Sequence, residues 1–144
     1  MVIVDSDVLI DTFRNYAPAV RWLAQTVAED EVVLPGYVVM ELIQGARNKA
    51  EQEKIRETIR QYAVLRPAED TCERATELLA TYHLGSGIGI IDALIGQLAL
   101  DVGLPLHTCN KRHYENIPEL EVRIPYERRA SGKSEANKAT DPEL

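Results

Sequence analysis

The sequence lacks the features that mark secreted, membrane-spanning or zinc-binding proteins. It has only two cysteines, Cys72 and Cys109, whose separation is not that of metal ligands, so we interpret them as free thiols in a reducing cytoplasm. No apolar run approaches the length that spans a bilayer. An apolar strand expected from Val2 leaves no room for a signal peptide. These absences predict a cytoplasmic protein that does not enter a membrane.

Basic residues are also scarce relative to acidic ones. The 144 residues include 16 Lys or Arg and 23 Asp or Glu, which gives a formal net charge of −7. This sign argues against a protein that holds nucleic acid through its overall charge alone. It is compatible with clustered carboxylates that recruit cations, and equally with a basic protein partner.

The sequence does contain a regular alternation of short apolar runs and longer amphipathic segments. Its length and its 45% hydrophobic content suit one globular domain. Strands are predicted at residues 2–4, 32–34, 64–67, 106–109 and 122–125. Helices are predicted at residues 9–16, 17–30, 37–48, 51–62, 68–83 and 90–102. This alternation predicts an α/β fold in which helices cover both faces of a mainly parallel sheet, with the first strand at its centre.

Two segments are expected to lie outside this regular structure. Residues 84–89 read LGSGIG, and the glycine spacing matches no standard phosphate-binding fingerprint, so we predict a flexible loop before a helix. Residues 127–144 contain no core residue before Leu144, and we expect this tail to be disordered or ordered only by a partner. The domain is therefore expected to span residues 1–126.

The strongest functional signal is the pair of aspartates that follows the first strand. Asp5 directly ends the apolar run, at the carboxyl end of a strand, where open α/β folds place their ligands. A buried carboxylate at such a place needs a partner. Turn formation and helix capping are the alternative interpretation, and they suit Asp7 better than Asp5.

Three further polar residues occupy comparable positions. Glu41 stands among apolar residues of its predicted helix, although a surface ion pair with Arg47 or Lys49 would also explain it. Asp92 lies in the first turn of its predicted helix, where N-terminal capping is the alternative. Asn110 follows a strand at a point where an acid would be expected.

Convergence of Asp5, Glu41 and Asp92 would place three carboxylates in one pocket. Two unit charges about 4 Å apart repel by roughly 4 kcal/mol at an effective dielectric constant of about 20, so three such groups cannot all remain ionised without a cation. Oxygen-only ligands favour Mg²⁺ or Mn²⁺, and the sequence offers no cysteine cluster or histidine pair for zinc.

The stretches VDSDVLID, VMEL, IIDALIGQLAL and HTCNKRHY, in this order and spacing, resemble the PIN-domain ribonucleases. Over residues 1–126 the length and layout resemble the VapC-type toxins of toxin–antitoxin pairs. The resemblance implies a three-layer α/β/α PIN-like fold with a short central sheet. By position, Asp5, Glu41 and Asp92 match the family's metal-binding catalytic acids, and Asn110 matches a fourth catalytic position that is often Asp.

The resemblance also implies the chemistry, the cofactor and the partners. Mg²⁺ or Mn²⁺ would support endonucleolytic hydrolysis of RNA by an activated water, releasing a 3′-hydroxyl and a 5′-phosphate. A cognate antitoxin, the RNA substrate and a second copy of the chain are the implied partners. Ser6 and Thr108 match polar positions beside the acids, and Asp7 stands where the family often has Asn. The residues that could hold the RNA backbone, or simply keep the surface soluble, are Lys111, Arg112, His113, Arg14 and Arg47.

Two other functions remain open from the sequence. DSDVLID also resembles the opening of the haloacid-dehalogenase-type phosphatases, in which a first Asp is the nucleophile and a second Asp two residues later is the acid–base group. That function would require Asp7 as much as Asp5, together with a later lysine and acid pair that the sequence does not place well. A non-catalytic binding module of the PIN fold is the third interpretation, and the three intact acids argue against it.

Overall fold

The computed structural model describes residues 1–128, so residues 129–144 of the expected tail lie outside the described part of the chain. Within that part, the strands are β1 (Val2–Val4), β2 (Val32–Pro35), β3 (Ala63–Leu65), β4 (Leu106–His107) and β5 (Val122–Arg123). The helices are α1 (Ser6–Phe13), α2 (Ala17–Glu29), α3 (Gly36–Gln44), α4 (Lys49–Ile59), α5 (Thr71–Ser86), α6 (Ile90–Val102) and α7 (Lys111–Tyr114).

The described strands form one sheet in the order β3-β2-β1-β4-β5, and every neighbouring pair is parallel. β1 is central, as predicted: Ile3 is in register with Val33 of β2 on one side and with Leu106 of β4 on the other. Ile3 and Val4 are fully buried, as expected of apolar residues in a central strand that is covered on both faces. The carboxyl ends of all these strands therefore meet at one edge of the sheet.

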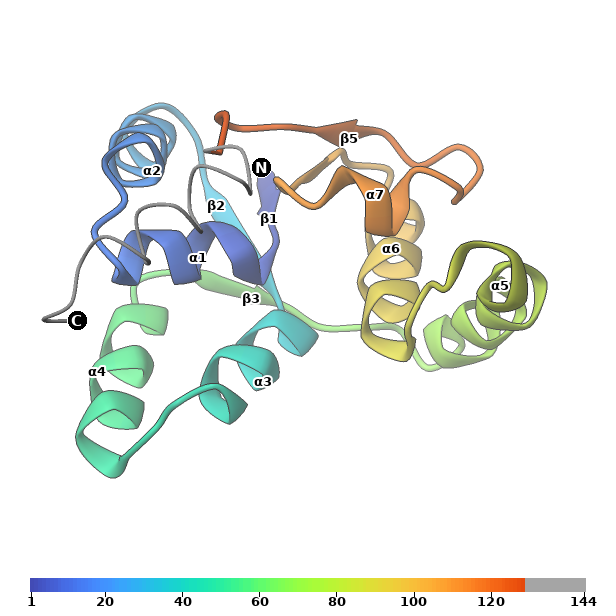
Figure 1. Cartoon of the computed structure of the whole chain (residues 1–144), viewed down its shortest axis with the longest axis horizontal. Coiled ribbons are helices and arrows are strands. Elements are labelled where there is room, and N and C mark those ends of the chain that lie inside the picture. The colour runs from blue at the N-terminus through green and yellow to red at the C-terminus, as the bar shows by residue number, and fades with distance from the viewer. Residues whose placement is uncertain (129–144) are drawn as a thin grey trace, which may run out of the picture.

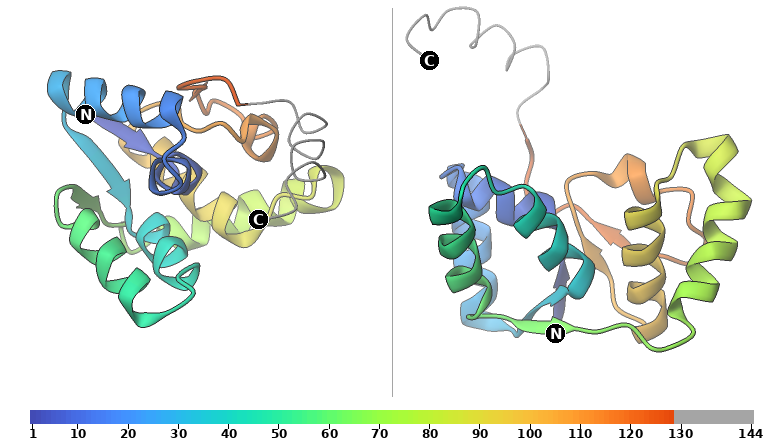
Figure 2. Two further views of the ribbon diagram at one scale, coloured as in Figure 1. Left: turned by 60° about the vertical axis from the view of Figure 1, so that its left-hand side comes forward. Right: turned by 90° about the horizontal axis from the view of Figure 1, so that it is seen from below.

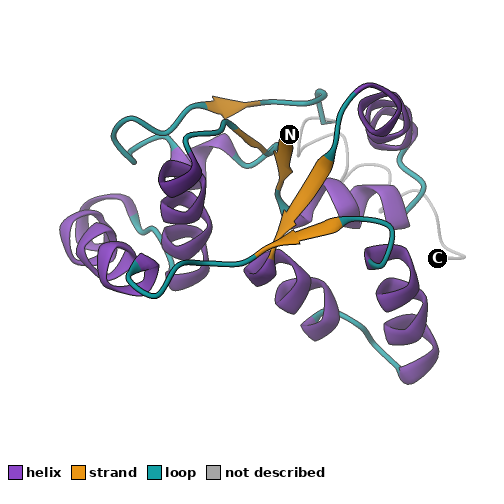
Figure 3. Ribbon diagram, turned by 180° about the vertical axis from the view of Figure 1, so that it is seen from behind, coloured by secondary structure: helices purple, strands orange, loops and turns teal. Residues whose placement is uncertain are grey.

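Helices flank the sheet, which is the predicted α/β architecture. In Figure 1, α1 to α4 form one group to the left of and below the central strands, and α5 to α7 form a second group to the right. α5 and α6 run side by side in the views of Figure 2, and Figure 3 shows the strands between the two groups of helices from behind. None of the helices in residues 1–128 is long and apolar enough to cross a membrane.

The first helix begins three residues earlier than predicted. α1 starts at Ser6 because Asp5 serves as its N-cap, with extended backbone angles and a carboxylate that accepts a hydrogen bond from the Ser6 amide. Asp7 therefore lies inside the first turn of the helix. This shift matters for the site because it buries both aspartates at the junction of β1 and α1.

Two other local predictions need correction. The predicted loop at residues 84–89 is partly helical, because α5 continues to Ser86 and ends only where Gly87 adopts a positive φ of 74°. The predicted strand at residues 106–109 stops at His107, and the short helix α7 that follows was not predicted. Both differences change the path of the chain close to Asp92 and Asn110.

Candidate active site

Asp5 lies at the carboxyl end of the central strand and is only 4% exposed. Its Oδ1 accepts a hydrogen bond from the Ser6 amide at 2.7 Å. Its Oδ2 accepts from the Thr108 hydroxyl at 2.9 Å and from the Tyr114 hydroxyl at 3.0 Å. Asp5 thus caps α1 with one oxygen and faces polar groups of two other segments with the second, so the capping and site interpretations both apply to it.

Tyr114 is a site residue that the sequence analysis missed. Its side chain is buried, and burial followed by the charges of Asp5 and Asp92 raises its pKa far above the ordinary value, so its hydroxyl stays a neutral donor. Gly96 on α6 allows the neighbouring segment to pack closely, because a Cβ there would lie only 2.7 Å from the Ile117 side chain, whereas the Tyr114 ring at 3.7 Å would be in ordinary contact. The signal in the sequence was the aromatic residue that closes HTCNKRHY.

Glu41 comes from α3 and points toward the same group of acids. Its Oε1 accepts a hydrogen bond from the Ser6 hydroxyl at 3.3 Å. Burial is the main reason that the pKa of Glu41 is raised, and the charges of Asp5, Asp92 and Asp7 raise it further. The surface alternative does not hold, because the ion pair that forms nearby joins Arg47 to Glu51 instead.

Asp92 lies in the first turn of α6 and completes the group. Burial raises its pKa, nearby His113 lowers it, and the charge of Asp5 raises it again. The His113 Nδ1 lies 3.5 Å from its Oδ2. A hydrogen bond from the amide of Gly89, the N-cap of α6, also acts on this carboxylate, so part of the capping interpretation applies. Asp5, Glu41 and Asp92 come from three separate parts of the fold, yet the charge of Asp5 raises the pKa of both Glu41 and Asp92.

Asp7 faces a different part of the site. Its Oδ2 accepts hydrogen bonds from the Cys109 amide at 2.7 Å and from the Thr108 hydroxyl at 3.2 Å, and lies 3.9 Å from Arg128. Burial, followed by the charge of Asp5, raises the pKa of Asp7 to about 6. Asp7 therefore fastens α1 to the segment after β4, with Thr108 shared between it and Asp5.

Asn110 lies on the Asp7 side of the site. Its backbone nitrogen donates to the Thr108 hydroxyl at 3.1 Å, and its side-chain oxygen lies 3.4 Å from the Nη1 of Arg128. Among the hydrogen bonds within residues 1–128, none joins Asn110 to Asp5 or Asp92. The structure thus groups Asn110 with Asp7 and Arg128.

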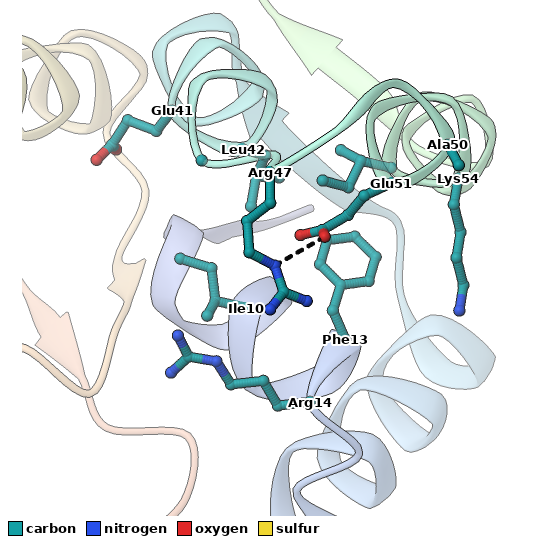
Figure 4. Close-up of a pocket in the computed structure, with 11 residues that line it drawn as sticks. Ile10, Phe13, Arg14, Glu41, Leu42, Arg47, Ala50, Glu51 and Lys54 are labelled. Carbon is teal, nitrogen blue, oxygen red and sulfur yellow. Dashed lines mark hydrogen bonds and ion pairs between the residues drawn. The ribbon is translucent and has the colours of Figure 1, made fainter. Parts of the chain in front are cut away.

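The basic residues fall into two groups around the acids. Lys111, Arg112 and His113 are exposed and, with Asn110, line a hollow of about 510 Å³ at α7. Arg14 and Arg47 instead line a groove of about 750 Å³ formed by α1, α3 and α4. Figure 4 shows Glu41 at one end of that groove, with its carboxylate directed away from the two arginines.

The donors at the site are of the type that a divalent cation prefers. Within residues 1–128, no group of three or more His, Cys, Asp or Glu side chains is already close enough to hold an ion directly. The available donors are carboxylate and hydroxyl oxygens, and the pKa values of Glu41 and Asp92 are raised first by burial and then by neighbouring carboxylates, Asp5 above all. The ion pairs of the described residues do not involve Asp5 or Glu41. A hard cation such as Mg²⁺ or Mn²⁺ would supply the missing charge.

Comparison with known proteins identifies the architecture. The model of the PIN domain family matches residues 2–119. A search of curated proteins gave no match. The structure is similar to a toxin–antitoxin complex from Klebsiella pneumoniae, with a TM-score of 0.72 and 24% identity over 89% of this chain and 100% of the other.

Two further solved structures agree with this result. VapBC-1 from nontypeable Haemophilus influenzae gives a TM-score of 0.69 and 25% identity, over 87% of this chain and 98% of the other. DNA-bound VapBC from Salmonella typhimurium gives a TM-score of 0.73 and 22% identity, over 88% of this chain and 100% of the other. The similarity therefore extends over nearly the full length of each compared chain.

Proposed function

This chain belongs to the PIN domain family, and from that premise we propose that it is a Mg²⁺- or Mn²⁺-dependent endoribonuclease acting as the toxin of a toxin–antitoxin pair. The observation that carries the proposal is the convergence of Asp5, Glu41 and Asp92 from the end of β1, from α3 and from α6. Neighbouring solved structures described as VapBC or toxin–antitoxin complexes support the toxin role.

The side chains around the acids hold them in place for this reaction. Thr108 and Tyr114 donate to the same oxygen of Asp5, while the Ser6 hydroxyl orients Glu41. A cation bound by the carboxylates would activate a water for in-line attack on the phosphodiester and stabilise the charge that develops at phosphorus. Lys111 and Arg112 are exposed at the neighbouring hollow and would bind the RNA backbone, and this exposure supports the proposal.

The competing functions have less support. The match to the PIN domain family over residues 2–119 leaves no basis for a haloacid-dehalogenase-type phosphatase. In addition, Asp7 is held by the Cys109 amide and by Thr108, which suits a structural contact better than an acid–base group. A binding module without catalysis would not need Asp5, Glu41 and Asp92 so close together that the charge of Asp5 raises the pKa of the other two.

The first prediction concerns the cation. Mg²⁺ or Mn²⁺ should raise the melting temperature, because an ion that relieves carboxylate repulsion binds the folded state preferentially. Titration calorimetry on partner-free protein should detect binding at millimolar metal or below, and the same Mn²⁺ should produce cleavage of total cellular RNA. Asp92→Asn should weaken the binding. Absence of any heat of binding to the wild type at millimolar metal would show that the site assignment is wrong.

The groove between α1, α3 and α4 is the proposed docking site for the antitoxin. Its apolar lining includes Ile10, Phe13 and Ile55, and Glu41 lies at one end (Figure 4). An apolar segment of the antitoxin would fill the groove, and an arginine or lysine of that segment would reach the acidic site beyond Glu41. Its charge would take the place of the metal and block cleavage. A homodimer of the toxin is also proposed, from the family resemblance.

The second prediction tests this groove. In a harmless Asp5→Asn background, Phe13→Asp should lose most of the antitoxin that copurifies, because it places a charge on the apolar lining. Met40→Asp is the matched control. Met40 lies on the neighbouring α3 and is 66% exposed, but it does not line the groove. Copurification is measured by native affinity purification and mass spectrometry. Equal loss in both variants, or a monomer that gains no partner, would contradict the proposed docking site and assembly.

A further inference from the structure

Arg128 is the last residue that the structure describes, and its guanidinium lies at the edge of the acidic site. Its Nε donates to the Oδ2 of Asp11 at 2.8 Å. Its Nη1 lies 3.4 Å from the side-chain oxygen of Asn110, and its Nη2 lies 3.5 Å from the backbone oxygen of Asp7 and 3.9 Å from the Asp7 carboxylate. The segment that carries Arg128 follows β5 and returns toward α1 and α2 (Figure 1).

Several contacts besides those of Arg128 hold this returning segment. The Tyr126 hydroxyl donates to Asp11 at 2.8 Å, and the Tyr16 hydroxyl donates to the backbone oxygen of Glu127 at 3.1 Å. The rings of Tyr16 and Tyr126 lie 5.9 Å apart, and the Cys109 thiol reaches the backbone oxygen of Tyr126. Fastening the segment therefore does not by itself account for a guanidinium directed toward the aspartates.

The guanidinium has donor capacity to spare. Its one short bond uses Nε, whereas the two terminal nitrogens, which carry the remaining N–H groups, make only long contacts within residues 1–128. The Arg128 side chain is 37% exposed, so it is partly open to solvent. A partly exposed guanidinium that is oriented by one carboxylate, and whose terminal nitrogens make only long contacts, suits the bidentate binding of a phosphate.

The surrounding charges indicate what Arg128 binds. Asp7 and Asp11 are buried in α1, which follows Asp5 directly, and among the described residues Arg128 is the cation that forms ion pairs with both. Arg128 therefore offsets part of the negative charge near the site that an RNA phosphate would approach. Asn110 connects Arg128 to the hollow that contains Lys111, Arg112 and His113. Arg128 therefore extends that basic surface up to the carboxylates.

We propose that Arg128 is an RNA-binding residue whose terminal nitrogens hold a backbone phosphate at the mouth of the carboxylate site, in an orientation set by Asp11. This inference rests on the proposed ribonuclease function and adds a residue to it from outside the segments that resemble the family. The phosphate contact lowers the repulsion that a negatively charged substrate would otherwise meet beside Asp7.

The test measures binding of a fluorescent single-stranded RNA in EDTA, where metal-dependent cleavage does not occur, over a series of salt concentrations. Arg128→Gln should weaken binding several-fold at low salt and reduce the slope of log affinity against log salt by about 0.7, the value for one phosphate contact on a single strand. Arg128→Lys should keep the slope. Tyr126→Phe is the matched control, because it removes the other bond to Asp11 and leaves the cation in place.

Steady-state cleavage with Mn²⁺ provides the second measurement. Arg128→Gln should raise KM more than it lowers kcat, because the contact is made to bound substrate as well as to the transition state. If Arg128→Gln and Tyr126→Phe lower the melting temperature alike and neither changes the salt slope, Arg128 only fastens the chain and the inference is overturned. If the wild type cleaves RNA but Arg128→Gln changes neither the salt slope nor KM, this inference alone is overturned. If Arg128→Gln reduces the salt slope but the wild type cleaves no RNA, the ribonuclease function alone is overturned.

Discussion

Asp5→Asn should abolish RNA cleavage while the protein remains folded. Asp5 is the most firmly held of the three acids, because the Ser6 amide and the hydroxyls of Thr108 and Tyr114 all donate to it. Asparagine keeps the size of the side chain and its capping oxygen but removes the charge that would bind the cation. Losing several kcal/mol of charge stabilisation corresponds to roughly a thousandfold in rate, since about 1.4 kcal/mol is tenfold.

The measurement combines cleavage of total cellular RNA, supplied with Mn²⁺, and growth on expression. The wild-type protein should cut RNA and arrest growth, whereas Asp5→Asn should do neither and should have a melting temperature equal to or slightly above that of the wild type. Wild-type protein that is free of copurifying partner and still cuts no RNA would refute the ribonuclease assignment. If Asp5→Asn does not fold, Asp92→Asn provides the same test, because the proposal also requires that this variant lose cleavage.

Asp7→Asn should instead retain cleavage and stabilise the protein at neutral pH. The pKa of Asp7 is raised from 3.8 to about 6, mainly by burial, so the folded protein favours the neutral acid. The stability that this group contributes is fully present below about pH 4 and is lost as the pH rises through 6. A shift of about two pKa units corresponds to about 3 kcal/mol, so we expect a gain of about 1–3 kcal/mol for Asp7→Asn at pH 7.5 and little gain at pH 4.

Urea or thermal unfolding in EDTA at several pH values measures this effect. The matched control is Asp101→Asn, because hydrogen bonds from Arg74, Gln97 and Thr71 outweigh the effect of burial and lower the pKa of Asp101. Asp101→Asn should therefore lose stability at neutral pH, whereas Asp7→Asn should gain it. If Asp7→Asn is destabilised at pH 7.5, or is as inactive as Asp5→Asn, then Asp7 has a role in the site that the present interpretation does not include.

The sequence alone was sufficient for the fold class and for the central strand. Short β-branched runs separated by amphipathic segments specify which residues are buried, and burial on both faces makes the run at β1 apolar throughout. The ends of the helices were less certain, because capping depends on single hydrogen bonds such as that from the Ser6 amide to Asp5. The extension of α5 to Ser86 went unrecognised for the same reason, since its end depends on the backbone of Gly87.

The sequence also indicated the three principal acids, because each stands where an isolated carboxylate would be costly. Spacing along the chain could suggest that Asp5, Glu41 and Asp92 converge, but only the parallel strand order brings the end of β1 close to α3 and α6. The contacts of Asp7 with Cys109 and of Asn110 with Arg128 likewise depend on how the segment after β4 turns.

Tyr114 and Arg128 were decided by the tertiary structure alone. Tyr114 reaches Asp5 across 109 positions of sequence, and Arg128 reaches Asp11 across 117. Local propensity and hydrophobic periodicity extend over a few turns of helix or one strand, so they carry no information about contacts at such separations. A buried tyrosine and an arginine near the end of a domain have ordinary structural explanations until the folded chain shows which carboxylate each one faces.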